Sequence, residues 1–524
     1  MVAPAGDDGR VAEPVTDVTD RAPDEPTAPE QPPAPGPRAR GPWLVAAATS
    51  TVLLLLATRY GYHRDELYFL LCGRHLDWGY VDQGPLAPAL ARLADTVAPG
   101  SLLALRTPSA LIAGAAVLLT AAIARELGAG RGGQTFAAFL AATSGIVLAP
   151  GHLLSTTTVD LLVWLAAAWC AVRLLRTGDS RWALGVGLAL GVGMLNKLLP
   201  ALLAAGLLAG VAVAGPRRLL RDRWVLAAAA LAALLAAPTL SWQATHGFPQ
   251  LSVAASIAGG DSSYSGRLDA LVLQFVIISP YAVPIWVAGL VALLRRPRWR
   301  AYRAVGWAWL VVVAVVLAAG GKGYYDAPLL LVLTAAGAVV AAGWAARARW
   351  RPGLLAAGAA LTVAGSAVLL LPTLPAQRLP DVVVAVNYDA GETIGWPAFA
   401  DSLATVHRGL PAGQRARAVI LTGNYGEAGA VARYGPARGL PAAYSGHNSM
   451  ADFGRPPENA DVVIAVGWQR PDRLRGWFTE VTLAGRVDQR VEVDNDENGG
   501  PIWVCRGLRR PWAQFWDAEV RHRG

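Results

Sequence analysis

The residues best suited to chemistry begin with two adjacent carboxylates, Asp65 and Glu66, which follow the first long apolar stretch of the chain. A carboxylate beside a membrane is costly to desolvate, so ionisable residues in such a place indicate a functional site. His63 and Arg64 precede the pair, and aromatic residues lie on both sides of it. A carboxylate can accept the proton of an acceptor group as that group attacks. We therefore interpret Asp65 and Glu66 as candidate catalytic residues rather than as charges of a solvated loop.

Other polar residues recur in later connections between apolar stretches, and we take them as candidates for the same site. For Asp160, which opens an apolar stretch, two interpretations stay open: a second catalytic carboxylate, or a charge that stabilises the start of a helix. The others are candidates for binding a substrate. They are Asp82, Arg106, Lys197, His246, Lys322 and Tyr325.

Lys197 and Lys322 are the only lysines of an arginine-rich chain. A lysine retained near a membrane suggests a need for a compact ammonium group rather than a planar guanidinium group. Such a cation can neutralise the charge that develops on a departing phosphate. Carboxylates and lysines together therefore suit the displacement of a phosphate by an acceptor. The sequence shows no His/Cys metal cluster and no phosphate-binding glycine loop, and it leaves open whether a divalent cation assists.

The composition indicates a protein that crosses the membrane many times. Of 524 residues, 54% are hydrophobic and 16% are charged, with a mean hydropathy of +0.37. Soluble domains carry about 25% charged residues. The net charge of +9 does not indicate nucleic acid as a partner, because the arginines form short clusters beside apolar stretches, which is the pattern of membrane topology.

Eleven apolar stretches have about the length that a membrane-spanning helix needs. We expect them near 43–58, 106–125, 134–151, 158–175, 182–196, 198–215, 224–241, 269–294, 304–320, 327–346 and 353–372. Arginine clusters fall in every second connection, and by the positive-inside rule these connections are cytoplasmic. The N-terminus is then cytoplasmic, whereas the first loop, 59–106, and everything after about 373 lie outside in the cell envelope.

The two ends of the chain differ from this membrane part, 42–373. Residues 1–41 are rich in Pro, Ala, Asp and Glu, and such a tail cannot bury enough apolar surface to fold. Residues 374–524 alternate short β-branched runs with helix-like stretches, which predicts a small α/β domain outside the membrane. The expected strands are Asp381–Val386, Ala418–Thr422 and Asp461–Val466, and the expected helices lie near 397–409, 426–434 and 470–478.

The motifs together resemble a known family. The Asp65-Glu66 pair in a large first loop, Pro85-Leu86 later in that loop, Asp160 at the start of a stretch, and Lys322-Gly323-Tyr324-Tyr325 near the last stretches resemble polyprenyl-phosphate-sugar-dependent GT-C glycosyltransferases. The closest resemblance is to family 39, which contains protein O-mannosyltransferases and the lipid A aminoarabinose transferase. It covers about 43–372. It implies an α-helical polytopic membrane fold of the GT-C type. It also implies that a sugar is transferred, with inversion, from an undecaprenyl- or dolichyl-phosphate sugar to a glycan, lipid or protein acceptor. The transfer would take place at the outer face of the membrane.

The resemblance also implies roles for individual residues. Asp65 matches the catalytic acidic position, with Glu66 beside it, and Asp160 matches a second acidic position. Lys197 and Lys322 stand where basic residues meet the lipid-linked phosphate, and Arg106 is a further candidate. His246 lies in a His-Gly-Phe-Pro stretch like those of bacterial members, without an assigned role.

Two departures from the family's patterns limit which acceptor is expected. Asp82-Gln83-Gly84-Pro85-Leu86 replaces the Lys-Pro-Pro-Leu of the aminoarabinose transferases, which argues against lipid A as the acceptor. The expected α/β domain replaces the β-trefoil of eukaryotic mannosyltransferases, which argues against protein mannosylation. Two other classes stay open as alternatives: a transporter or flippase of lipid-linked sugars, and a membrane-anchored glycan-binding protein.

Overall fold

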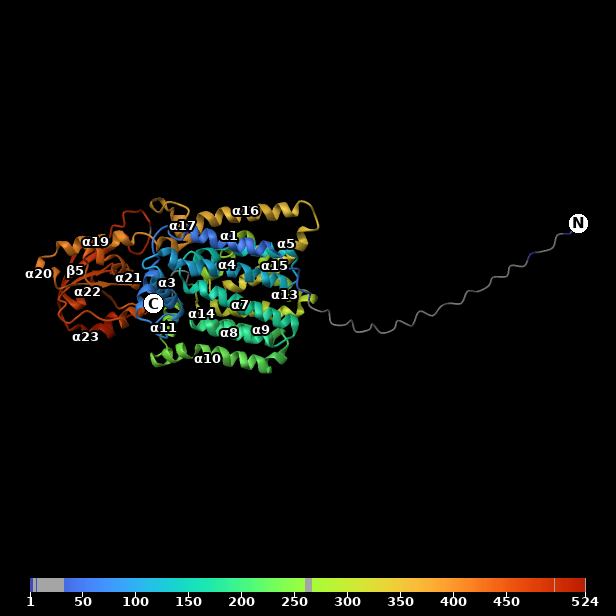
Figure 1. The fold of residues 1–524 in the computed structure, drawn as a ribbon, viewed down its shortest axis with the longest axis horizontal. Coiled ribbons are helices and arrows are strands. Elements are labelled where there is room, and N and C mark those ends of the chain that lie inside the picture. The colour runs from blue at the N-terminus through green and yellow to red at the C-terminus, as the bar shows by residue number, and fades with distance from the viewer. Residues whose placement is uncertain (3–5, 7–32, 260–265, 494, 524) are drawn as a thin grey trace.

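The computed structural model describes residues 1–2, 6, 33–259, 266–493 and 495–523. Long helices run side by side in one bundle, and a sheet with its own helices lies at one end of that bundle (Figure 1). The predicted disordered tail, 1–41, falls mostly outside the described residues. The structure therefore bears on the bundle, on the first loop and on the region that contains the sheet.

Within the described residues, six apolar helices are long enough to cross a membrane. They are α4 (Leu102–Glu126), α7 (Thr156–Thr177), α10 (Arg223–Thr245), α14 (Arg303–Ala319, with the preceding turn from Pro297), α15 (Ala327–Ala345) and α16 (Arg351–Leu369). Helices suit this environment because they satisfy all their backbone hydrogen bonds internally.

Further apolar helices are bent or shorter. Two pairs meet at a bend: α5 (Arg131–Ala142) with α6 (Gly145–Gly151) at 52°, and α12 (Arg267–Val276) with the segment Pro280–Arg295, which contains α13 (Val283–Arg295), at 75°. Three are shorter: α1 (Gly41–Leu56), α8 (Trp182–Met194) and α9 (Pro200–Ala214). Each of the apolar stretches predicted from the sequence falls on one of these helices or bent pairs. The number of spans stays a prediction.

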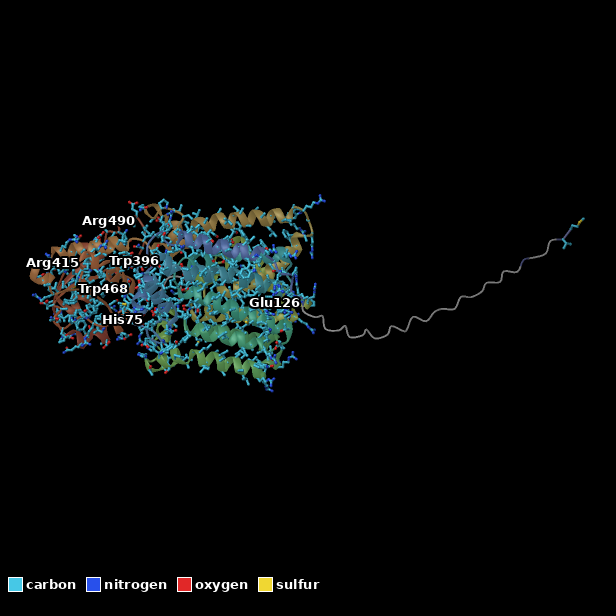
Figure 2. The ribbon with its side chains drawn as sticks, viewed as in Figure 1. His75, Glu126, Trp396, Arg415, Trp468 and Arg490 are labelled. Carbon is cyan, nitrogen blue, oxygen red and sulfur yellow. The ribbon has the colours of Figure 1, made fainter. Side chains whose placement is uncertain are left out.

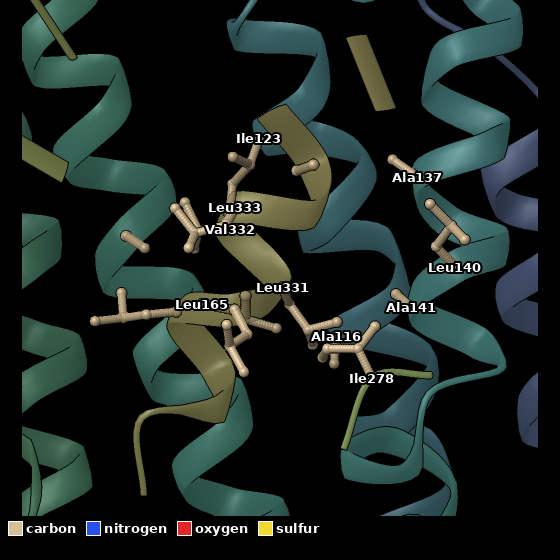
Figure 3. Close-up of a cluster of buried hydrophobic side chains, with 14 of the residues drawn as sticks. Ala116, Ile123, Ala137, Leu140, Ala141, Leu165, Ile278, Leu331, Val332 and Leu333 are labelled. Carbon is tan, nitrogen blue, oxygen red and sulfur yellow. The ribbon is translucent and has the colours of Figure 1, made fainter. Parts of the chain in front are cut away.

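Helix α15 forms the centre of the bundle. Leu329 to Leu333 are all at most 1% exposed, as expected for a helix that is apolar on every side. Figure 3 shows Leu331, Val332 and Leu333 among side chains of neighbouring helices. A Cβ at Gly289 of α13 would overlap the Leu333 carbonyl, and one at Gly337 of α15 would overlap the Ile285 carbonyl. Small residues therefore allow these two helices to approach closely.

Arginines gather at the end of the bundle that faces away from the sheet. Glu126 closes α4 there, at the opposite end from Trp396 and Trp468 (Figure 2). It forms ion pairs with Arg125, Arg173 and Arg176 at 3.9, 3.6 and 2.6 Å. Three residues of the predicted cytoplasmic clusters thus meet at one end, and the sheet lies at the other.

We expect this sheet end to face outward, so that the C-terminus lies outside the cytoplasm. A fluorescent protein fused after Gly524, of a kind that folds only in the cytoplasm, should stay dark, and alkaline phosphatase fused there should be active. As a control, the same reporters should give the opposite result after Arg221, in a predicted cytoplasmic connection. Cytoplasmic fluorescence from the C-terminal fusion would refute the orientation.

The first loop and the C-terminal region form the cap on the bundle. The loop contains α2 (Arg64–Arg74) and α3 (Leu86–Val97), and α11 (Pro249–Ala258) also lies at this end. The sheet has the order β2-β1-β3-β5-β4, in which β1 is parallel to β2 and β3, and β5 is antiparallel to β3 and β4. The strands are β1 (Ala418–Thr422), β2 (Ala443–Ser445), β3 (Val462–Val466), β4 (Phe478–Arg486) and β5 (Pro501–Leu508).

The helices of the C-terminal region are α17 (Asp381–Val386), α18 (Tyr388–Gly391), α19 (Trp396–Gly409), α20 (Ala412–Arg415), α21 (Tyr425–Tyr434), α22 (Asp472–Trp477) and α23 (Trp512–Phe515). Three of them, α19, α21 and α22, lie at the predicted positions, and the other helices were not predicted. The strand predicted at Asp381–Val386 is wrong, because this segment is a helix. A short apolar run does not by itself distinguish the two structures. Here Val383 and Val384 pack against Leu379 and Ile394, away from the sheet.

Candidate active site

A cavity of about 1490 Å³ lies between the bundle, the first loop and the C-terminal region. Five residues predicted for the site from separate parts of the sequence line it together. They are Asp65, Asp82, Lys197, Lys322 and Tyr325. The other four, Glu66, Arg106, Asp160 and His246, do not line it. The adjacent carboxylates of the first loop are thus separated by the fold.

Asp65 is the carboxylate of that pair that faces the cavity. It lies in the first turn of α2, where His63 Nδ1 accepts a hydrogen bond of 3.1 Å from its backbone N–H. Its Oδ1 accepts a hydrogen bond of 2.8 Å from the hydroxyl of Tyr425. Although burial disfavours the ionised form, the charge of Arg64 and this hydrogen bond hold the pKa of Asp65 below its ordinary value. Asp65 is therefore ionised at neutral pH, as a base must be.

Glu66 points the opposite way and is fully buried. Arg106 donates to both of its oxygens, from Nε to Oε1 at 2.9 Å and from Nη2 to Oε2 at 2.8 Å. The backbone N–H groups of His63 and Leu154 also donate to it, at 2.8 and 3.0 Å. A helix turns about 100° per residue, so neighbours on α2 face different surroundings. This geometry ties Glu66 and Arg106 to each other and to the backbone of the first loop.

Asp82 faces the cavity from the same loop, between α2 and α3. Its Oδ1 accepts a hydrogen bond of 2.9 Å from the Tyr68 hydroxyl of α2. Burial raises the pKa of Asp82 to about 6, against the lowering effects of this bond and of the Lys197 charge.

In the part of the chain that the structure describes, no group of three or more His, Cys, Asp or Glu side chains is placed to hold a metal ion.

Lys197 reaches the cavity from the turn between α8 and α9. The preceding residue fixes that turn, because Asn196 Nδ2 donates to Asp160 Oδ1 at 2.9 Å and to Thr156 O at 2.8 Å. The first loop is tied to the same turn by a bond of 2.8 Å from Gly84 N to Asn196 O. The Asp160 carboxylate thus contacts Asn196, the residue that precedes Lys197.

Lys322 enters the cavity from the turn between α14 and α15. Burial and the nearby positive charge of Lys197 lower its pKa below the ordinary lysine value, against the opposing effect of Tyr325. Among the described residues, neither lysine forms an ion pair with a carboxylate. The two cations still repel each other, and an anion bound between them would relieve that repulsion.

The sequence did not reveal that His246 lies outside the cavity, or that residues of the C-terminal region line it. His246 lies on the surface and stacks on Trp242, with ring centroids 3.9 Å apart. The C-terminal region supplies two acidic side chains to the cavity that were not predicted, Glu392 and Asp496. Glu392 and Asp496 approach Arg64 at 3.2 and 3.3 Å.

Tyr425 is the other unpredicted residue, and the sequence held a partial signal for it. It is the first residue of α21, in Asn424-Tyr425-Gly426-Glu427, where the chain passes from β1 into the helix, which is the usual place for a ligand loop in an α/β sheet. Only the fold shows that this loop meets the first loop.

Comparisons with known proteins show what the chain and its fold resemble. Residues 82–242 match the family described as dolichyl-phosphate-mannose-protein mannosyltransferase. No curated protein matches the chain significantly. The structure of ArnT from Cupriavidus metallidurans in the apo state matches with a TM-score of 0.55 and 16% identity, covering 88% of this chain and 97% of that one.

Two more solved structures share the fold. ArnT from the same organism bound to undecaprenyl phosphate gives a TM-score of 0.53 at 16% identity, covering 89% of this chain and 98% of that one. The arabinofuranosyltransferase AftD from Mycobacteria gives 0.51 at 17% identity, covering 92% of this chain and 40% of that one. The resemblance to GT-C glycosyltransferases expected from the sequence is confirmed, because part of the chain matches the mannosyltransferase family and the fold is shared with ArnT and AftD.

Proposed function

We propose that the protein transfers a sugar from a polyprenyl-phosphate-linked donor to an acceptor at the outer face of the cell membrane, with Asp65 as the general base. The observation that carries this proposal is that one cavity holds Asp65 together with Lys197 and Lys322. The carboxylate suits an acceptor proton, and the two ammonium groups suit a phosphate. ArnT, which shares the fold, binds undecaprenyl phosphate, and this ligand has the chemistry that the cavity requires.

The lining of the cavity also suits a lipid. Leu268 and Val272 of α12 and Leu361 of α16 also line it, and all three are exposed. A prenyl chain would cover such side chains while its phosphate lies between the lysines. A ligand with an apolar tail and an anionic head therefore fits both parts of the lining.

The reaction proceeds as one displacement. Asp65 removes the proton of the acceptor hydroxyl as its oxygen forms a bond to the anomeric carbon. The bond from that carbon to the phosphate oxygen breaks, and polyprenyl phosphate leaves with the bonding electrons. Attack opposite the leaving group inverts the anomeric configuration. Lys197 and Lys322 neutralise the charge that the phosphate gains.

The proposed function also goes with a division of the chain into three parts. We propose a cytoplasmic tail at 1–41, a membrane domain at 42–373 and a C-terminal domain outside the cytoplasm at 374–524. A transporter would need its charged groups near the middle of the membrane. Here the candidate residues gather near the sheet end of the bundle, which favours transfer at one membrane face.

The full-length protein in native membranes, which supply the acceptor, tests the proposal. We expect undecaprenyl phosphate to be released from undecaprenyl-phosphate-mannose or undecaprenyl-phosphate-arabinose, with the sugar recovered on a membrane or envelope product. The proposal fails if the wild-type protein releases no more undecaprenyl phosphate than the Asp65→Asn variant from either donor.

The lysines make a second test. Lys322→Met and Lys197→Met should each raise the donor KM or lower kcat by about 10- to 100-fold, the effect of losing a hydrogen bond to a charged group. Inhibition by added undecaprenyl phosphate should weaken in parallel. Lys322→Arg keeps the charge and serves as the matched control, with a smaller loss. If both methionine variants turn over donor normally, the phosphate is bound elsewhere.

A further inference from the structure

The hydroxyl of Tyr425 contacts the proposed base from the C-terminal region, 360 residues further along the chain. It donates a hydrogen bond of 2.8 Å to Asp65 Oδ1. Tyr425 also lines the cavity, as does Asp65. One oxygen of the carboxylate is therefore engaged by Tyr425, and an acceptor would approach the other.

The ring of Tyr425 stacks on two other rings. Tyr68 stacks on it with centroids 4.6 Å apart and an interplanar angle of 24°, and His447 stacks on it with centroids 4.7 Å apart and the same angle. The guanidinium of Arg64 lies 5.2 Å from the ring centroid. Because these neighbours restrict the ring, its hydroxyl has a fixed direction toward Asp65.

The backbone around Tyr425 is held by a capping box and by the packing of α21 against α2. Asn424 and Glu427 form a capping box at the start of α21, with bonds of 2.9 Å from Glu427 N to Asn424 Oδ1 and 3.1 Å from Asn424 N to Glu427 Oε2. A Cβ on Gly426 would lie 2.7 Å from Arg64 Cβ, and one on Gly429 would lie 2.6 Å from Leu67 Cβ. Two glycines thus let α21 pack directly on α2, which carries Asp65.

We propose that Tyr425 is a positioning residue for the reaction, whose hydroxyl orients the Asp65 carboxylate and stabilises its ionised form. This inference rests on the proposed function, in which Asp65 is the base. It makes the C-terminal region a component of the active site rather than a separate glycan-binding module. Tyr425 takes no proton itself.

Tyr425→Phe tests the inference, because it keeps the stacked ring and removes the hydroxyl. In the donor assay we expect kcat to fall by about 10- to 100-fold, as for the loss of a hydrogen bond to a charged group, with little change in donor KM. The hydrogen bond from Tyr425 favours the ionised carboxylate, so its loss raises the pKa of Asp65. The acid limb of the pH profile of kcat should therefore move to higher pH.

Tyr434→Phe is the matched control, since Tyr434 ends the same helix and does not line the cavity. It should leave kcat and the pH profile unchanged. In an Asp65→Asn background, Tyr425→Phe should cause no further loss. The inference is overturned if Tyr425→Phe keeps wild-type kcat, or lowers kcat without moving the acid limb. The proposed function is judged separately, by Asp65→Asn alone.

Discussion

Replacing Asp65 with Asn should lower kcat by about 10²- to 10⁴-fold, the usual contribution of a general base. Asparagine keeps the size of the side chain and an oxygen that can accept the hydrogen bond from Tyr425, but it cannot take a proton. The donor KM should change little, because the lysines that would hold the phosphate are untouched. The measurement is release of undecaprenyl phosphate at saturating donor, in membranes with equal amounts of each variant.

Asp82→Asn is the matched control for this experiment. Asp82 faces the same cavity and, like Asp65, accepts a hydrogen bond from a tyrosine hydroxyl. Burial raises the pKa of Asp82 to about 6. A carboxyl group with this pKa can also act as a base at neutral pH. Asp82 is therefore the rival candidate, and Asp65 is preferred because the family resemblance assigns the catalytic acidic position to Asp65. We expect its variant to keep more activity than Asp65→Asn. Should Asp65→Asn retain near-wild-type kcat while Asp82→Asn loses it, the base is Asp82, and if neither matters the cavity is not the active site.

The parts of the fold that sequence alone predicted are those fixed by local composition. An apolar stretch of sufficient length becomes a helix in a membrane because its backbone has no other way to satisfy its hydrogen bonds. The predicted stretches therefore coincide with helices, including the bent pair that meets near Pro280. The run at Asp381–Val386 lacked such a constraint, and whether it became strand or helix depended on distant packing partners.

The sequence marked five residues that line one cavity, but it did not distinguish them from the four candidates that lie elsewhere. The pair Asp65 and Glu66 stood out by charge, yet only the direction of α2 decides that one faces the cavity and the other faces Arg106. Asp160 was open between two interpretations, and the structure adds a third, since its carboxylate accepts a hydrogen bond from Asn196 beside Lys197. Tyr425 lay beyond prediction, because nothing local links it to a carboxylate 360 residues earlier.

The division of tasks within the Asp65-Glu66 pair predicts that Glu66→Gln damages the protein through stability rather than through chemistry. The ion pair of Glu66 with Arg106 has side chains 0% and 1% exposed, and its closest atoms are 2.8 Å apart. Removing one partner of a buried pair leaves an uncompensated charge, at a cost of about 3–5 kcal/mol. We expect a clear drop in the melting temperature of the detergent-solubilised protein and a lower yield in membranes. The kcat of the folded fraction should exceed that of Asp65→Asn.

Two comparisons separate charge burial from a general sensitivity to mutation. Asp461→Asn breaks the Arg417–Asp461 pair, whose side chains are 52% and 53% exposed, and such a pair contributes at most about 1 kcal/mol. It should hardly move the melting temperature. The double variant Glu66→Gln with Arg106→Gln removes both buried charges, so it should be more stable than Glu66→Gln alone. If Glu66→Gln instead melts like the wild type and loses kcat as completely as Asp65→Asn, Glu66 takes part in the reaction, and the loop moves from the arrangement described here when substrate binds.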